Sequence, residues 1–137
     1  HLLAGSEPAI QRKRRAQWKR AHVIAEKLGR ETPVAILGDA NSTGFLDGAG
    51  GERTFILEEA KRANLEVVTS DLGCSEYFRL GDEPLRPSLL DHVVATPGMT
   101  RRPKLWGYCA KLACKVPSED PEEFRVISDH CPVTLDL

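Results

Sequence analysis

Side chains of one face recur at three- and four-residue steps between residues 7 and 29, and this period predicts a single amphipathic helix. The residues on this face are Ile10, Arg14, Gln17, Trp18, Ala21, Ile24, Ala25 and Leu28. Gly29 is the expected end of the helix. We therefore expect Trp18 and Leu28 to be buried and His22 to lie on the surface.

A short apolar run at residues 34–37 follows Pro33 and ends at Gly38, a pattern typical of a strand buried on both faces. Residues 89–95 are predicted to form a second strand with polar side chains set into it, and residues 133–137 the last strand. The other expected elements are a helix over 55–63 capped by Thr54, extended segments at 65–68 and 104–109, a glycine-rich loop at 44–51, and a loop or short exposed helix over 115–124. Strands that alternate with helices predict a layered α/β or α+β fold.

Composition adds that the chain is of ordinary globular type. Its 137 residues fit one domain or a piece of a larger one, with 41% apolar and 28% charged residues. The apolar runs are too short for a transmembrane segment. The net charge of −1 provides no global field for holding a polyanion. Residues 11–30 nevertheless carry eight Lys/Arg against one Glu, which we interpret as the solvated face of the helix, with Arg12, Lys13, Lys19 and Arg20 exposed.

The cysteines leave two alternatives open. No pair among Cys74, Cys109, Cys114 and Cys131 has the two-residue spacing of a zinc knuckle or a redox motif. One or two disulfides would suit an exported protein, and four buried thiols would suit a cytosolic one. In both cases we expect the cysteines to be structural, and the localisation stays open.

Three short polar clusters lie at the edges of predicted strands, at residues 38–41 (GDAN), 90–92 (LDH) and 128–130 (SDH). His1, just before two leucines, is a fourth candidate. Loops at strand ends are where layered folds gather functional groups. Each cluster alone is a weak signal, because an aspartate after a strand is most often a turn or cap residue. Their order and spacing together predict a functional site.

With this arrangement the chain resembles the endonuclease/exonuclease/phosphatase superfamily, which includes deoxyribonucleases, AP endonucleases, sphingomyelinases and inositol phosphatases. The resemblance spans the whole chain and is carried by His1-Leu2 and by residues 15–17 (RAQ), 33–41 (PVAILGDAN), 90–93 (LDHV) and 128–133 (SDHCPV). The most specific part is the pairing of Gly-Asp-x-Asn with Ser-Asp-His-x-Pro. The large residue that the family often has between the Asp and the Asn is an alanine here, Ala40.

The resemblance implies a four-layer α/β sandwich, with two β-sheets face to face and helices outside. It also implies that residues 1–137 are the C-terminal portion of one such domain, whose N-terminal half would supply an Asn and a Glu at strand ends. That Glu is a principal ligand of the family's catalytic metal. We therefore expect residues 1–137 alone to be inactive or nearly so.

The residue types fit phosphodiester hydrolysis, which needs a positioned water and neutralisation of charge on the phosphoryl oxygens. Asp39 is an acceptor that could orient or deprotonate the water. Asn41, two residues on, projects to the same side and can donate to a phosphate oxygen. Asp129 is a hard oxygen ligand suited to Mg²⁺ or Mn²⁺.

The histidines take the remaining roles. His130 can serve as a base or stabilise charge, and His1 could be the second imidazole, donating to a phosphoryl or leaving oxygen. Asp91 would fix the tautomer of one of these histidines, and which one stays open. His92 should point away from Asp91 along the strand and is expected to be structural.

These observations predict a divalent-metal-dependent phosphoesterase, in particular a phosphodiesterase or nuclease, whose substrate could be DNA, RNA, a phospholipid head group or an inositol phosphate. The first alternative is a non-catalytic protein of the same fold that acts as a binding module. The second, a nucleotide-binding α/β domain, lacks a phosphate loop: the glycines at 48–51 are followed by no Lys-Ser/Thr.

Overall fold

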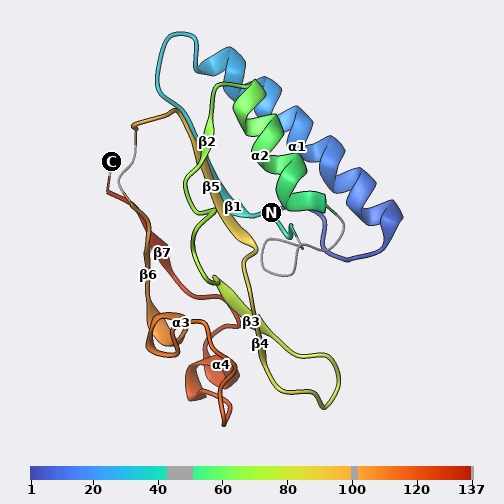
Figure 1. The fold of residues 1–137 in the computed structure, drawn as a ribbon, viewed down its shortest axis with the longest axis vertical. Coiled ribbons are helices and arrows are strands. Elements are labelled where there is room, and N and C mark those ends of the chain that lie inside the picture. Colours follow the sequence, from blue (N-terminus) through green and yellow to red (C-terminus); the bar gives the residue numbers. More distant parts are fainter. Residues whose placement is uncertain (43–50, 100–101, 137) are drawn as a thin grey trace.

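The computed structural model describes residues 1–42, 51–99 and 102–136, which form four helices and seven short strands (Figure 1). In chain order these are α1 (Pro8–Leu28), β1 (Ala35–Asp39), α2 (Glu52–Arg62), β2 (Glu66–Val67), β3 (Glu76–Phe78), β4 (Arg86–Ser88), β5 (Asp91–Ala95), β6 (Lys104–Leu105), α3 (Gly107–Lys111), α4 (Glu122–Val126) and β7 (Val133–Thr134). Helices combined with small antiparallel sheets make this an α+β protein, as expected. The glycine-rich loop predicted at 44–51 lies, but for Gly51, outside the described residues.

The main sheet has the order β1-β5-β2, and both of its strand pairs are antiparallel. The register of β1 and β5 places Asp39 opposite Asp91 and Leu37 opposite Val93. Two smaller antiparallel pairs, β3–β4 and β6–β7, lie beside it. Helices α1 and α2 contact each other and cover one face of the main sheet (Figure 1).

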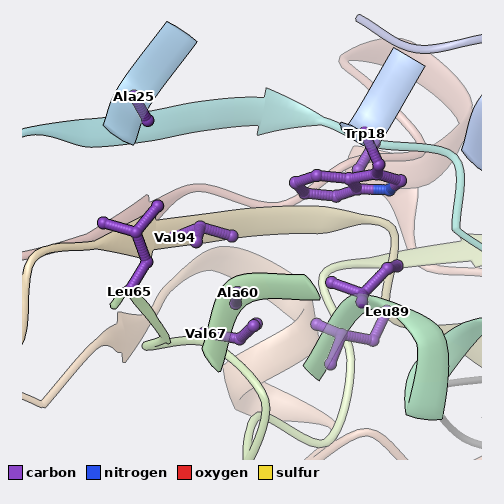
Figure 2. Close-up of a cluster of buried hydrophobic side chains, with 9 residues drawn as sticks. Trp18, Ala25, Ala60, Leu65, Val67, Leu89 and Val94 are labelled. Atoms are coloured by element: carbon purple, nitrogen blue, oxygen red, sulfur yellow. The ribbon is translucent and has the colours of Figure 1, made fainter. Parts of the chain in front are cut away.

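The core between the helices and the sheet contains Trp18 and Ala25 of α1 and Val94 of β5, together with apolar residues of α2 and β2 (Figure 2). The helix prediction over residues 7–29 is confirmed, but the buried stripe of α1 is narrower than expected. It consists of Arg14, Trp18, His22 and Ala25. Leu28 is 60% exposed, because it lies on the last turn and off this stripe. Its predicted burial is wrong.

His22 is 3% exposed, so its predicted surface position is also wrong. His22 falls on the buried stripe of α1, where its flat ring packs against Trp18. The centroids of the two rings lie 5.3 Å apart. Burial lowers the pKa of His22, so the neutral ring is the form that fits this interface.

The prediction that the first strand is buried on both faces is wrong for the described part of the chain. β1 is an edge strand, and α1 and α2 cover only the face that contains Ile36. Leu37 points the other way, since neighbouring side chains alternate across a sheet, and it is 65% exposed. A large apolar side chain is thus displayed on the face opposite the helices.

Two disulfides, Cys74–Cys114 and Cys109–Cys131, decide the open question about the cysteines. All four sulfurs belong to a second core around Tyr77, Leu85 and Tyr108, which joins β3, α3 and the segments before β4 and β7. Disulfides are typical of proteins that fold in an oxidising environment.

Several local predictions need correction here. The strand predicted over 104–109 ends at Leu105, because Gly107, with a φ of 66°, begins α3 instead. Helix α2 starts at Glu52, so Thr54 lies inside its first turn and does not cap it. The β3–β4 hairpin was not predicted, because its strands are only three residues long and show no clear alternation.

His92 is 2% exposed on the helix-facing side of β5, as predicted, with Nδ1 3.3 Å from the Thr69 hydroxyl oxygen. Burial lowers its pKa to about 4. Below pH 6.5 the unfolded chain takes up a proton that native His92 refuses, so this residue makes the free energy of unfolding fall as pH falls from about 6.5 to about 4. The expected loss is about 3 kcal/mol.

The prediction is checked by urea denaturation of the wild type and of His92→Asn, which keeps an acceptor near Thr69, at several pH values between 7.5 and 4. Glu76, whose pKa is raised, acts in the opposite direction over this range but contributes equally to both proteins. The stability gap between wild type and variant should therefore narrow as pH falls. Parallel curves would show that folding does not change the pKa of His92.

Candidate active site

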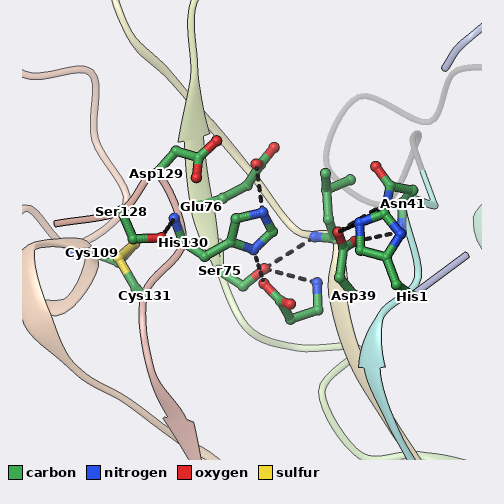
Figure 3. Close-up of polar contacts among 12 residues, drawn as sticks. His1, Asp39, Asn41, Ser75, Glu76, Cys109, Ser128, Asp129, His130 and Cys131 are labelled. Carbon is green, nitrogen blue, oxygen red and sulfur yellow. Dashed lines mark hydrogen bonds and ion pairs between the residues drawn. A yellow bond between two sulfur atoms is a disulfide. The ribbon is translucent and has the colours of Figure 1, made fainter. Parts of the chain in front are cut away.

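The candidate site is built where β1 and β5 lie side by side, because their register brings Asp39 and Asp91 to the same end of the sheet. Asp39 lies on the face opposite the helices, in the same orientation as Leu37. The segment 128–130 reaches this place from the other end of the chain, through the isolated bridge between Glu76 and His130. Figure 3 shows the side chains that meet there.

The first group in the site is His1, Asp39 and Asn41 (Figure 3). Nε2 of His1 lies 3.0 Å from Oδ2 of Asp39, and the Asn41 amide donates to the same oxygen over 2.9 Å. The backbone N–H of Asn41 donates to Oδ1 of Asp39 over 2.8 Å. This bond folds the chain into a tight turn, with Asn41 at a φ of 47°. Both oxygens of Asp39 are therefore held by donors.

The segment before α1 is fixed against the end of β1. The Leu2 N–H donates to the Asp39 carbonyl over 2.9 Å, and the Asn41 amide donates to the Leu2 carbonyl over 3.1 Å. The His1 side chain remains 71% exposed. It is thus oriented by a carboxylate on one side.

The second group is the pair Asp91 and His130. Nδ1 of His130 lies 2.7 Å from Oδ2 of Asp91, which decides the question of which histidine Asp91 serves. This hydrogen bond is the main cause that raises the pKa of His130 to about 9. Burial opposes ionisation of Asp91, but hydrogen bonds from His130 and Ser75 overcome it and lower the pKa of Asp91. The pair is therefore an imidazolium with its carboxylate at neutral pH.

A residue that sequence reasoning missed, Glu76 of β3, lies on the other side of the His130 ring (Figure 3). Its side chain is 7% exposed, and its Oε2 is 3.4 Å from Nε2 of His130. Burial raises the pKa of Glu76 to about 7, although His130 opposes this shift. The only sequence signal was a charged residue directly after Cys74-Ser75 and before two aromatic residues, which carries no motif.

Asp129 is exposed, and the hydrogen bonds that fix its position are made by its backbone carbonyl. Its carbonyl accepts from the Tyr77 N–H over 3.0 Å and from the Tyr108 hydroxyl over 2.6 Å. The next residue but one, Cys131, donates its N–H to the Ser75 carbonyl over 2.8 Å and is joined to Cys109. The turn that carries Asp129 and His130 is thus fastened on both sides.

One ligand atom each from Glu76, Asp129 and His130 lies within 4.8 Å of the others, so these three could hold a metal ion. Asp39 is near enough to contribute to the raised pKa of both Glu76 and His130, which connects the two groups electrostatically. The structure therefore brings together all six predicted site residues, His1, Asp39, Asn41, Asp91, Asp129 and His130, and adds Glu76. Four carboxylates surround two imidazoles.

Comparison with known proteins identifies no relative: no family model, no curated protein and no solved structure matches this chain. Within the described ranges, no helix is long and apolar enough to cross a membrane.

Proposed function

We propose that this protein hydrolyses phosphate esters with the help of a divalent cation, Mg²⁺ or Mn²⁺, and that its substrates are phosphodiesters, such as those of nucleic acids or of lipid and other small esters. The observation that carries the proposal is the meeting of two histidine–carboxylate pairs, His1 with Asp39 and His130 with Asp91, at one end of the sheet. Paired groups of this kind provide proton transfer on two sides of a bound phosphate.

Each polar side chain of the site would have its own role in hydrolysis. His130, held through Nδ1 by Asp91, directs Nε2 into the site, where the charged ring can donate to a phosphoryl oxygen. The Asn41 amide donates to Asp39 and to the Leu2 carbonyl, and it would exchange one of these bonds to act as a neutral donor to the same phosphate. Asp39 can accept the proton of an attacking water, and His1, exposed next to it, can donate to a leaving oxygen.

The donor set fits a divalent cation. Carboxylate oxygens are hard ligands that suit both Mg²⁺ and Mn²⁺. Asp129 would hold the ion, with Glu76 as the nearest second carboxylate. When bound, the cation supplies positive charge that stabilises the developing charge on the phosphoryl oxygens. Four carboxylates around two imidazoles also leave the site negative, so an anionic substrate needs such a cation to bind.

We also propose that residues 1–137 are the C-terminal portion of a four-layer α/β sandwich of the superfamily that the sequence resembles. The exposed Leu37 face of β1 supports this proposal, because a sandwich packs a second sheet against that face. The N-terminal half would then add the family's Asn and Glu to the site, and residues 1–137 alone would turn over little substrate.

The test is hydrolysis of bis-p-nitrophenyl phosphate by the full-length protein, with Mg²⁺ or Mn²⁺ and with a chelator. We expect turnover only with the cation, and Asp129→Asn should raise the cation concentration needed for half-maximal rate by about tenfold or more. Asp82→Asn, an exposed aspartate in the β3–β4 turn, is the matched control. Equal turnover in the chelator would contradict the proposal. No turnover but retained phosphate binding would favour the binding-module alternative.

A further inference from the structure

The segment that carries His1 has no regular secondary structure, yet polar contacts fix it along its length. Beyond the contacts of Leu2 with Asp39 and Asn41, the Leu3 N–H donates to the Gln17 side chain over 3.1 Å. The carbonyls of Leu3 and Gly5 both accept from one side chain, Arg14 of α1. The direction in which His1 enters the site is therefore set from α1 as well as from β1.

Arg14 is 0% exposed, and all three nitrogens of its guanidinium donate hydrogen bonds. Nη1 donates to the Leu3 carbonyl over 2.6 Å and to the Gly5 carbonyl over 2.8 Å. Nε and Nη2 donate to the two carboxylate oxygens of Glu52, over 2.8 and 2.6 Å. Glu52 is the first residue of α2 and is equally buried. One side chain thus joins α1, the start of α2 and the segment before α1.

A buried ion pair such as Arg14–Glu52 contributes little net stability by itself. Taking two charges out of water costs about as much as their attraction returns, and well-packed apolar residues of similar volume often replace a buried ion pair without loss. What apolar residues cannot replace is the second pair of hydrogen bonds, to the carbonyls of Leu3 and Gly5. Only the planar fork of arginine reaches a carboxylate and two carbonyls at once, and lysine has no such geometry.

We propose that Arg14 is a positioning residue that sets His1 against Asp39 by holding the Leu3 and Gly5 carbonyls. The Nε2–Oδ2 distance of 3.0 Å between His1 and Asp39 depends on the path of residues 1–5, and Arg14 is the only fully buried side chain among the described residues that holds this path. The catalytic consequence rests on the function proposed above. The positioning itself does not.

The decisive variant combines Arg14→Met with Glu52→Leu in the full-length protein. It removes the pair without leaving an unpaired buried charge, so the α1–α2 interface should still form. A second variant, Arg14→Lys, keeps the charge for Glu52 but loses the fork. Ile56→Ala is the matched control, because it loosens the same interface and leaves in place the bonds of Arg14 to Leu3 and Gly5.

The readouts are amide hydrogen exchange at Leu2 and the nuclear Overhauser effect between the His1 ring and the Asn41 amide. In the double variant we expect Leu2 to lose its protection and the His1–Asn41 effect to disappear, while the His130 ring signals stay unchanged. Arg14→Lys should show the same changes in part. Ile56→Ala should keep the wild-type pattern.

For hydrolysis we expect kcat to fall by about 10²-fold in the double variant with little change in KM, since a catalytic group about 1 Å out of place loses roughly that much. Persistence of Leu2 protection and of the His1–Asn41 effect in the double variant would overturn the positioning role. Loss of both in a protein that hydrolyses no phosphate ester would support the positioning role and refute the proposed function instead.

Discussion

Replacing His130 by alanine is expected to lower kcat/KM for a phosphodiester by about 10³-fold, within the range found for a general acid or base. His130 is the one imidazole of the site whose two nitrogens both face carboxylates, Asp91 at 2.7 Å and Glu76 at 3.4 Å. The alanine variant loses the positive charge near the phosphate and leaves two carboxylates without their common partner. The measurement is steady-state hydrolysis of bis-p-nitrophenyl phosphate by the full-length protein.

The matched control for this prediction is His22→Gln, which changes a buried histidine of α1 that packs against Trp18 in the core. Its activity should stay within a few-fold of the wild type when both are measured folded. The activity of Asp91→Asn should lie between those of His130→Ala and His22→Gln, with a loss of about 10- to 100-fold, because the Asp91 carboxylate only orients the His130 ring. A His130→Ala enzyme as active as His22→Gln would remove His130 from the mechanism.

The second large effect is expected from the disulfide Cys109–Cys131. Replacing both cysteines by alanine should lower the free energy of unfolding by about 3 kcal/mol, because the bridge closes a loop between residues 22 apart. Cys131 directly follows His130, and its N–H bond to the Ser75 carbonyl fastens the same turn. Activity should therefore fall together with stability.

The other disulfide, Cys74–Cys114, provides the control. It closes a loop between residues 40 apart, so its removal should cost at least as much stability. Cys74 precedes Ser75 and Glu76 in the chain, but the bridge leaves the residues next to His130 untouched, so its loss should affect kcat/KM less than that of Cys109–Cys131. Urea denaturation and hydrolysis, both measured on fully folded protein, separate the two effects. Equal losses of activity would show that the disulfides act on the site only through global stability.

Local patterns explain which parts of the fold could be predicted. The three- and four-residue period around Trp18 and Ala25 depends only on neighbouring residues, and it gave α1 correctly. The apolar run before Asp39 and the strand that contains Asp91 were found in the same way. The exposure of Leu37 could not be predicted, because it depends on whether a second layer covers β1.

Prediction of the site residues from the sequence was limited in the same way, because local motifs mark only some of them. The predicted residues stand in short motifs at strand ends, so sequence reasoning could name them before their convergence was known. Glu76 stands in no motif, and it enters the site only because β3 bridges to His130, a pairing between residues far apart in the chain. The partner of Asp91 likewise depended on long-range geometry that spacing alone does not contain.

The most direct test of the proposed phosphoesterase site is a crystal structure of the full-length protein grown with Mn²⁺ and inorganic phosphate, with the ion located by its anomalous scattering. We predict that Mn²⁺ binds the Asp129 carboxylate and that the phosphate lies between Asn41 and His130, within hydrogen-bond distance of both. Mn²⁺ bound away from Asp129, or a phosphate that contacts neither Asn41 nor His130, would contradict the proposal that these residues form one phosphoesterase site.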